Sequence, residues 1–244
     1  MPEGSILGPL LYLLFTSDVP TSNEYGKTPE ESTNTLQSAI NEVSNWTKKW
    51  RIKLNESKSV HVDFSYKDIS QRSLYLDNNI IPYSNSAKYL GMTLDAKLRW
   101  KEHVKKKKEA LDLKFSKMYW LIGRHSTLSI YNKLLIYKQV LKPVWTYGIQ
   151  LWGCTSKNNI EIIQRFQNKV LRTIVNAPWY IRNKDLHRDL NVAMVQDEIC
   201  RFAQQHAKRL SIHANDEVAK LIQIQNSQRR LKRVRPLDLA QEFP

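Results

Sequence analysis

The stretch that decides the fold is residues 99–122, which read RWKEHVKKKKEALDLKFSKMYWLI. Its apolar positions recur at intervals of three and four residues, so the spacing predicts one long amphipathic helix from Trp100 to Ile122. Beyond it the helical pattern continues nearly to the end of the chain, with helices predicted over 129–141, 160–175 and 195–212. We expect the first of these three to stop before Pro143, because proline lacks the backbone N–H that a helix interior needs.

Upstream of this stretch, helix and strand patterns are mixed. Thr28, Pro29 and Glu31 have the order of a capping residue, a proline in the first turn and a capping-box glutamate. Apolar residues then recur at helical spacing from Leu36 to Trp50, which predicts a helix with one buried face. Alternation over 60–64 and 74–76 predicts two strands, and 88–94 a third. The chain is therefore expected to be α+β, a small antiparallel sheet plus helix followed by a mostly α-helical region.

Basic charge is concentrated in one part of the chain. The 244 residues include 38 Lys+Arg and 23 Asp+Glu, a net charge of +15 that favours a polyanionic partner. Residues 99–142 contain 12 basic and 3 acidic residues, so this segment alone carries +9. We expect its basic side chains to contact a nucleic-acid backbone, namely Lys105, Lys106, Lys107, Lys108 and Arg124. An ordinary solvated helix face is the alternative for the lysine run.

A second basic cluster lies near the carboxyl end. It contains Arg229, Arg230, Lys232, Arg233 and Arg235. Arginine-rich segments bind nucleic-acid backbones without sequence preference, so Arg229, Arg230 and Arg233 are predicted to bind phosphates in the same way. A basic tail with no specific role remains open.

Several kinds of site are not expected. The seven glycines form neither of the common nucleotide phosphate loops. Cys154 and Cys200 lie 46 positions apart without metal-ligand spacing, which predicts free thiols with no disulfide partner in an intracellular compartment, either nucleus or cytoplasm. The most apolar stretch, residues 6–15, is too short to span a bilayer, so no membrane partner is expected.

Three short motifs are more specific in combination than any one of them alone. They read PEGSILGP at 2–9, WRIKLNESKS at 50–59 and KYLG at 88–91. In this order and spacing they resemble the reverse transcriptase of non-LTR retrotransposons of the jockey type, and the resemblance runs from Pro2 almost to the carboxyl end. The stretches KMYWL at 117–121, LKPVWTYG at 141–148, QLWG at 150–153 and APWY at 177–180 are similar to the thumb and the helical region that follows it.

The resemblance implies a role for each motif. Residues Gly4, Ser5, Gly8 and Pro9 would lie beneath the template and the incoming nucleotide, with Glu3 in place of the family's glutamine. Lys58 would stand near the departing pyrophosphate as a proton donor. The hairpin that grips the primer end would be formed by Lys88, Tyr89, Leu90 and Gly91.

The resemblance also implies a domain order and partners. A partial reverse-transcriptase palm is expected over 1–98, a basic helical thumb-like segment over 99–154, and a helical carboxyl-terminal region with a basic tail over 155–244. The partners it implies are RNA and DNA, as primer and template.

The aspartates that would hold catalytic metal are missing from the sequence. The family binds paired Mg²⁺ with one aspartate upstream of the first motif and an Asp-Asp hairpin downstream of it. Here Met1 stands inside that first motif, seven residues separate Pro20 from Thr28 where the hairpin is expected, and no Asp-Asp pair occurs anywhere. Glu24 alone is a poor substitute, since Mg²⁺ requires a strict octahedral set of ligands. No metal site and no cofactor are therefore expected in this chain, although the intact family uses Mg²⁺.

These observations favour a truncated, catalytically inactive reverse-transcriptase fragment that still binds RNA and DNA. Two alternatives stay open. One is a non-enzymatic nucleic-acid-binding helical protein derived from a retrotransposon. The other is a chain that folds poorly, because loss of a palm hairpin exposes sheet edges and apolar surface.

Overall fold

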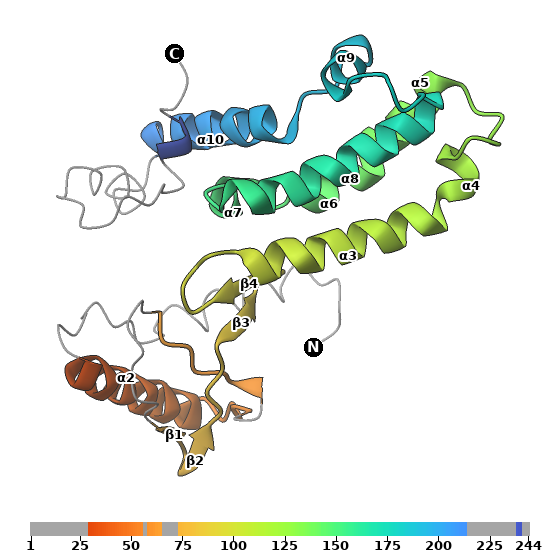
Figure 1. Ribbon diagram of the computed structural model, residues 1–244. Coiled ribbons are helices and arrows are strands. Elements are labelled where there is room, and N and C mark those ends of the chain that lie inside the picture. The colour runs from red at the N-terminus through yellow and green to blue at the C-terminus, as the bar shows by residue number, and fades with distance from the viewer. Residues whose placement is uncertain (1–28, 56–57, 65–72, 214–237, 241–244) are drawn as a thin grey trace. The chain divides into compact units, whose positions relative to one another are not determined.

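The computed structural model describes residues 29–55, 58–64, 73–213 and 238–240. The chain divides into two compact units, Met1–Lys88 with Asp95–Leu98 and Tyr89–Leu94 with Arg99–Pro244 (Figure 1). Helices dominate, and two small antiparallel two-stranded sheets accompany them, so the predicted α+β class is confirmed. No helix in the described ranges is long and apolar enough to cross a membrane.

The first unit packs one helix, α2 (Pro29–Lys49), on a short hairpin. Strand β1 (Leu74–Leu76) pairs antiparallel with β2 (Asn79–Ile81), and Leu74 lies opposite Ile81. The turn between them places Asp77 at φ 47° and Asn78 at φ 68°, the left-handed pair that a tight hairpin turn requires. Leu74, Leu76 and Ile81 form its small apolar core, with partly buried Ile40 and Leu54 against them.

The predicted helix is confirmed at 29–49, but the prediction of its apolar face is wrong in part. Leu36 and Trp50 are exposed, whereas Ser44 and Thr47 are buried. The physical reason is that the face of α2 toward the hairpin is held by polar interactions, described below. Thr28, the predicted capping residue, lies outside the described residues.

The strand predicted over 60–64 is wrong. Val60 and Phe64 are exposed, and His61 is the buried residue of this segment. His61 forms an isolated parallel bridge with Tyr83, in which its N–H donates to Pro82 O at 3.0 Å and its carbonyl accepts from Ser84 N–H at 2.9 Å. The bridge therefore buries the face of the segment that carries His61, and not the face that carries the apolar Val60 and Phe64.

A second hairpin replaces the single strand predicted over 88–94. Strand β3 (Ser86–Tyr89) pairs with β4 (Met92–Asp95). Leu90 at φ 44° and Gly91 at φ 74° form the turn between them. The boundary between the two compact units runs through this hairpin.

The second unit is a bundle of helices around one apolar core, which includes the fully buried Leu111, Trp145, Trp152 and Ile199. Its elements are α3 (Lys101–Lys117), α4 (Tyr119–Ile122), α5 (Ile130–Ile136), the π-helix η2 (Tyr137–Leu141), α6 (Lys142–Thr146), α7 (Ile149–Trp152), α8 (Lys157–Val175), α9 (Asn183–Asp189), α10 (Val195–Ser211) and the 3₁₀ turn η4 (Asp238–Ala240). This core contains residues from the segment predicted over 99–154 and from the region predicted over 155–244.

The helices predicted over 160–175 and 195–212 are confirmed as α8 and α10. The single helix predicted over 100–122 is wrong at Met118, where α3 ends and α4 begins. The stop predicted before Pro143 is also wrong, because the chain continues through η2 into α6. Pro143 stands in the first turn of α6, and the π-helical register before it accommodates the missing N–H.

Candidate nucleic-acid interface

A tyrosine from the turn between α6 and α7 holds the tip of the second hairpin. The Tyr147 hydroxyl donates to Leu90 O at 2.6 Å. Two glycines with left-handed backbones flank this contact. A Cβ on Gly91 would lie 3.4 Å from the Tyr147 ring, and a Cβ on Gly148, at φ 69°, would lie 2.7 Å from Met92 Sδ. A side chain at Gly148 would therefore be both strained and crowded.

The predicted primer-grip residues lie at this tip. Lys88, Tyr89 and Leu90 all have exposed side chains, although the Leu90 carbonyl is engaged by Tyr147. The sequence offered no signal for Tyr147 itself beyond its place in the similar segment 141–148, since its partner is 57 positions away. The tip is thus fixed through its backbone while its side chains stay free to bind a ligand.

An apolar groove of about 380 Å³ runs beside the tip, within the second unit. It is lined by hairpin, turn and helix residues, namely Leu90, Met92, Thr146, Tyr147, Gly148, Gln150, Leu151, Phe202, Gln205, His206 and Arg209. Sequence reasoning did not single out the α10 residues of this groove. Their helical spacing resembles that of an ordinary core face.

The four lysines of the run on α3 have different environments. Lys106 pairs with Glu102 at 2.7 Å and Lys108 pairs with Asp112, each one turn away on the same helix. Lys105 is exposed and has no ion-pair partner among the described residues. Lys107 is half-buried, and its Nζ donates to Val144 O at 2.7 Å and lies 4.9 Å from the centroid of the Tyr147 ring.

Lys107 therefore supports the tyrosine that holds the hairpin tip. Burial lowers the pKa of Lys107, and the carbonyl of Val144 accepts a hydrogen bond from the ammonium group. Among the described residues, the exposed and unpaired charge of the run therefore comes from Lys105.

Arg124 follows α4 and is exposed, with no ion-pair partner in the described part of the chain. Its backbone position is fixed by the preceding residue, because buried Lys133 donates from Nζ to Gly123 O at 3.0 Å. Trp120 on α4 is exposed as well. From Lys105 to the end of α3 at Lys117 the helix rises about 18 Å, so Lys105 and Arg124 lie toward opposite ends of α3.

His103 joins the hairpin to α3. It is buried, and its Nδ1 accepts a hydrogen bond from Thr93 N–H at 3.1 Å. Burial lowers the pKa of His103 to about 4, and the positive charges of Lys107 and Lys106 act in the same direction. The imidazole is thus neutral at physiological pH and serves as a structural acceptor.

The buried carboxylate of the second unit is also structural. Glu198 on α10 pairs with Lys142 on α6 and with Arg201. Burial alone would raise the pKa of Glu198, but the hydrogen bonds and charges of Lys142 and Arg201 outweigh it and hold this pKa below its ordinary value. Within the described ranges, no group of three or more His, Cys, Asp or Glu side chains is placed to hold a metal ion.

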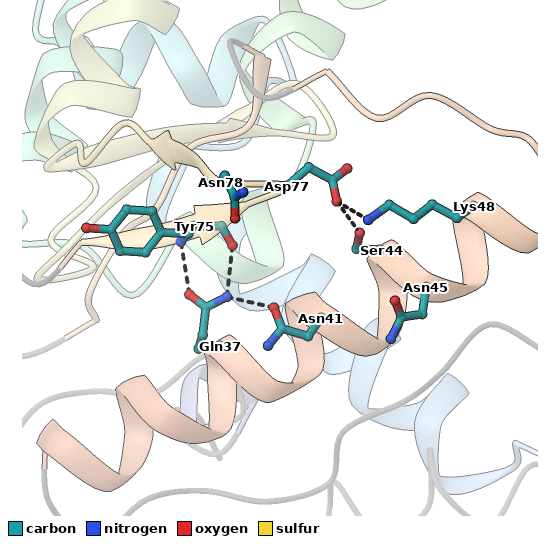
Figure 2. Close-up of a pocket in the computed structure, with 8 residues that line it drawn as sticks. All are labelled: Gln37, Asn41, Ser44, Asn45, Lys48, Tyr75, Asp77 and Asn78. Carbon is teal, nitrogen blue, oxygen red and sulfur yellow. Dashed lines mark hydrogen bonds and ion pairs between the residues drawn. The ribbon is translucent and has the colours of Figure 1, made fainter.

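The first unit contains an open polar groove of about 630 Å³ between α2 and the first hairpin (Figure 2). Gln37 donates from Nε2 to Tyr75 O at 2.8 Å, and its Oε1 accepts from Tyr75 N–H at 2.9 Å. Asp77 accepts from Ser44 Oγ at 2.6 Å and pairs with Lys48 at 2.6 Å. Hydrogen bonds from Lys48 and Ser44 lower the pKa of Asp77. These bonds join helix to hairpin, which explains why this face of α2 is polar.

The remaining predicted site residues lie apart from these features or outside the described residues. Lys58 is exposed, and its backbone N–H donates to Asn55 Oδ1 at 3.2 Å. Within the described ranges, no hydrogen bond or ion pair joins Lys58 to another predicted site residue. Gly4, Ser5, Gly8 and Pro9 lie outside the described residues, as do Arg229, Arg230 and Arg233.

Known proteins similar to this chain are encoded by mobile elements of Drosophila melanogaster. The chain is 38% identical, over 263 residues, to a protein named probable RNA-directed DNA polymerase from transposon X-element, and this match covers 100% of the chain. It is 34% identical, over 98% of its length, to the RNA-directed DNA polymerase from mobile element jockey. It is 33% identical, over 96% of its length, to the probable RNA-directed DNA polymerase from transposon BS.

The chain spans less than a third of the length of these relatives, 29% for the first two. The matched part is their carboxyl-terminal portion. The first alignment extends over 263 residues and this chain has 244, so at least 19 positions of that relative have no counterpart here. No protein-family model and no solved structure matches the chain. These matches confirm the resemblance predicted from the short motifs.

Proposed function

The chain is homologous over nearly its whole length to reverse transcriptases of jockey and related non-LTR elements, and on this premise we propose that it is an enzyme fragment that binds RNA and DNA without polymerising DNA. The X-element, jockey and BS relatives are each named as RNA-directed DNA polymerases. Such enzymes act on a primer paired with a template, so that duplex is the ligand we propose here.

The observation that carries the binding proposal is the fixed, exposed hairpin tip. Tyr147 holds the Leu90 backbone, Lys107 supports Tyr147, and the side chains of Tyr89 and Leu90 remain exposed. Lys105 belongs to the same unit and adds an exposed positive charge. A pre-formed tip with cations in its own unit suits a nucleic-acid backbone, because little conformational entropy is lost on binding.

The proposal of inactivity rests on the sequence. Two-metal polymerisation needs several carboxylates around paired Mg²⁺ ions. The chain has no Asp-Asp pair, and the segment between Pro20 and Thr28 is shorter than the hairpin expected there. At least 19 positions of the X-element protein have no counterpart in this chain, which supports a loss of residues relative to that protein.

Binding can be measured by fluorescence anisotropy with a labelled RNA–DNA primer-template at several salt concentrations. We expect affinity to fall linearly on a log–log plot against salt, because phosphate binding releases counterions. The variant Lys105→Glu with Arg124→Glu should bind more weakly and reduce the salt slope by about 1 for each phosphate that it no longer neutralises. Lys157→Glu, another exposed lysine changed to the same residue, is the control for net charge.

Salt-insensitive or absent binding would contradict the binding proposal. Equal losses of affinity in Lys157→Glu and in either single variant, Lys105→Glu or Arg124→Glu, would attribute binding to net charge alone and contradict the assigned surface. The same preparation should show no primer extension with Mg²⁺. Mg²⁺-dependent nucleotide incorporation by the wild-type chain would refute the proposed inactivity.

A further inference from the structure

The connection from α8 to α9 contains a closed turn. Ile181 N–H donates to Pro178 O at 3.3 Å, and Trp179 and Tyr180 occupy the two central positions. The two rings meet edge to face, with centroids 6.0 Å apart. Both side chains point away from the core, since Trp179 is 89% exposed and Tyr180 is 67% exposed.

One arginine clamps this turn at both ends. Arg172, in the last turn of α8, donates from Nη1 to Pro178 O at 2.9 Å and from Nη2 to Ile181 O. Its Nε donates to Asn183 Oδ1 at 3.0 Å, at the start of α9. The planar guanidinium suits such a set of hydrogen bonds, which a lysine cannot reproduce. The backbone of the turn is therefore held in place at both ends.

Uncompensated positive charge follows the turn directly. Arg182 and Lys184 are exposed and have no ion-pair partners among the residues that the structure describes. Arg188, further along, is paired with Asp185 at 3.4 Å and Asp189 at 3.1 Å. Because Arg182 and Lys184 stand next to the exposed rings, a polyanion fits this surface better than an apolar protein partner does.

We propose that Trp179 and Tyr180 form a stacking platform for the bases of a single-stranded nucleic acid, with Arg182 and Lys184 binding its phosphates. Aromatic faces stack on unpaired bases without sequence preference, and basic side chains follow the backbone. A duplex offers no free base faces along its length, so the platform selects single strands. This site rests on the proposed function and deepens it by naming a second ligand, distinct from the duplex assigned to the hairpin tip.

The test uses the full chain and a fluorescein-labelled twelve-nucleotide oligouridine RNA, with binding followed by anisotropy. The double variant Trp179→Ala, Tyr180→Ala should bind this RNA at least about fivefold more weakly, given the usual contribution of one stacked base. Trp179→Phe should retain most of the affinity, because a phenyl ring still stacks. Tyr131→Ala, which removes another aromatic ring that is 74% exposed, should have no effect.

Arg172→Lys tests the clamp. It keeps the charge but cannot form the full set of hydrogen bonds, so single-strand affinity should fall between the wild type and the double alanine variant. Circular dichroism melts of each variant check that the fold is intact, and Trp179 and Tyr180 are exposed enough that their truncation opens no cavity.

Unchanged oligouridine affinity in the double variant would overturn the platform. An equal loss of affinity for a labelled RNA–DNA duplex in the double variant would also overturn it. If the wild type is a dimer and the double variant is a monomer with unchanged RNA affinity, the rings serve self-association instead. Loss of duplex binding alone in Lys105→Glu with Arg124→Glu would support two separate surfaces. Absence of all binding by the wild type would overturn the proposed function as well.

Discussion

His103 shows how one buried side chain links the hairpin to the helices. Thr93 N–H needs an acceptor, and only the neutral imidazole provides one at Nδ1. Protonation would replace that acceptor with a donor and place a charge beside Lys107 and Lys106. The residue is therefore a point of acid sensitivity.

The pKa of His103 predicts a pH dependence of stability. The pKa of His103 in the folded chain is about 4, below its ordinary value of 6.5. Between pH 4 and pH 6.5 the unfolded chain therefore binds more protons than the folded chain does. Stability is then fully present above pH 6.5 and decreases as the pH falls toward 4, by on the order of 3 kcal/mol in total. Urea unfolding at pH 7 and pH 5 measures the part of this loss of stability that falls between those two pH values.

A control variant isolates this residue. His103→Asn keeps an acceptor for Thr93 N–H, because its Oδ1 takes the place of Nδ1, but does not titrate, so stability should change less between pH 7 and pH 5 than in the wild type. Asp77 and Glu198 titrate below their ordinary values of 3.8 and 4.5, so they contribute little in this window. An identical pH slope in the variant would contradict the assignment.

At the scale of single residues, the sequence shows which side chains are charged but not always which groups they contact. The pairing of Lys106 with Glu102 follows from four-residue spacing on one helix. Lys107 and Lys133 look similar in the sequence, yet each donates to a backbone carbonyl, and the Val144 carbonyl is 37 positions from its lysine. Such partners depend on tertiary packing, which a charge count does not contain.

At the scale of elements, the packing of α2 on the first hairpin stands out, because a glutamine pairs with a strand. Gln37 bonds both the N–H and the carbonyl of Tyr75, as a neighbouring strand would (Figure 2). An unpaired strand edge is a template for association with other chains. The amide side chain of Gln37 therefore covers part of the edge of β1.

Replacing this amide tests that function. Gln37→Ala should destabilise the first unit by about 1–2 kcal/mol, because the two hydrogen bonds to the Tyr75 backbone are removed along with one to Asn41, and should increase self-association. Thermal melting and sedimentation velocity measure the two effects. Asn45→Ala, in the same groove but without a bond to the strand, should change neither. An equal effect of both variants would contradict the edge-covering role.

The sequence predicts the elements unevenly, for physical reasons. The helices α8 and α10 were predictable because a long period of 3.6 residues fits no other structure. The strand predicted over 60–64 was wrong because a segment of five alternating residues can bury either of its faces. The bridge between His61 and Tyr83 buries the face that carries His61. The hairpin at 90–91 and the chain through Pro143 depend on local backbone geometry that hydrophobic spacing does not reveal.

At the scale of the whole molecule, the two compact units have cores of very different size. Among the described residues, the first unit buries Leu74, Leu76 and Ile81 as its apolar cluster, whereas the second has a core built from nearly all its helices. Apolar area removed from water is the main source of stability. The second unit should therefore be the more stable one, and it contains the hairpin tip, the basic helix α3 and the clamped turn.

This difference predicts two unfolding transitions in calorimetry, the first unit melting at the lower temperature. Leu74→Ala should lower only the first transition and Leu111→Ala only the second, since each residue is fully buried in its own core. Truncating a buried leucine costs about 2–5 kcal/mol, enough to shift a transition by several degrees. Nucleic acid should raise only the second transition, because the residues proposed to bind it lie there. A single transition that both variants shift equally would mean that the units fold as one, and binding could then not be assigned to either by melting.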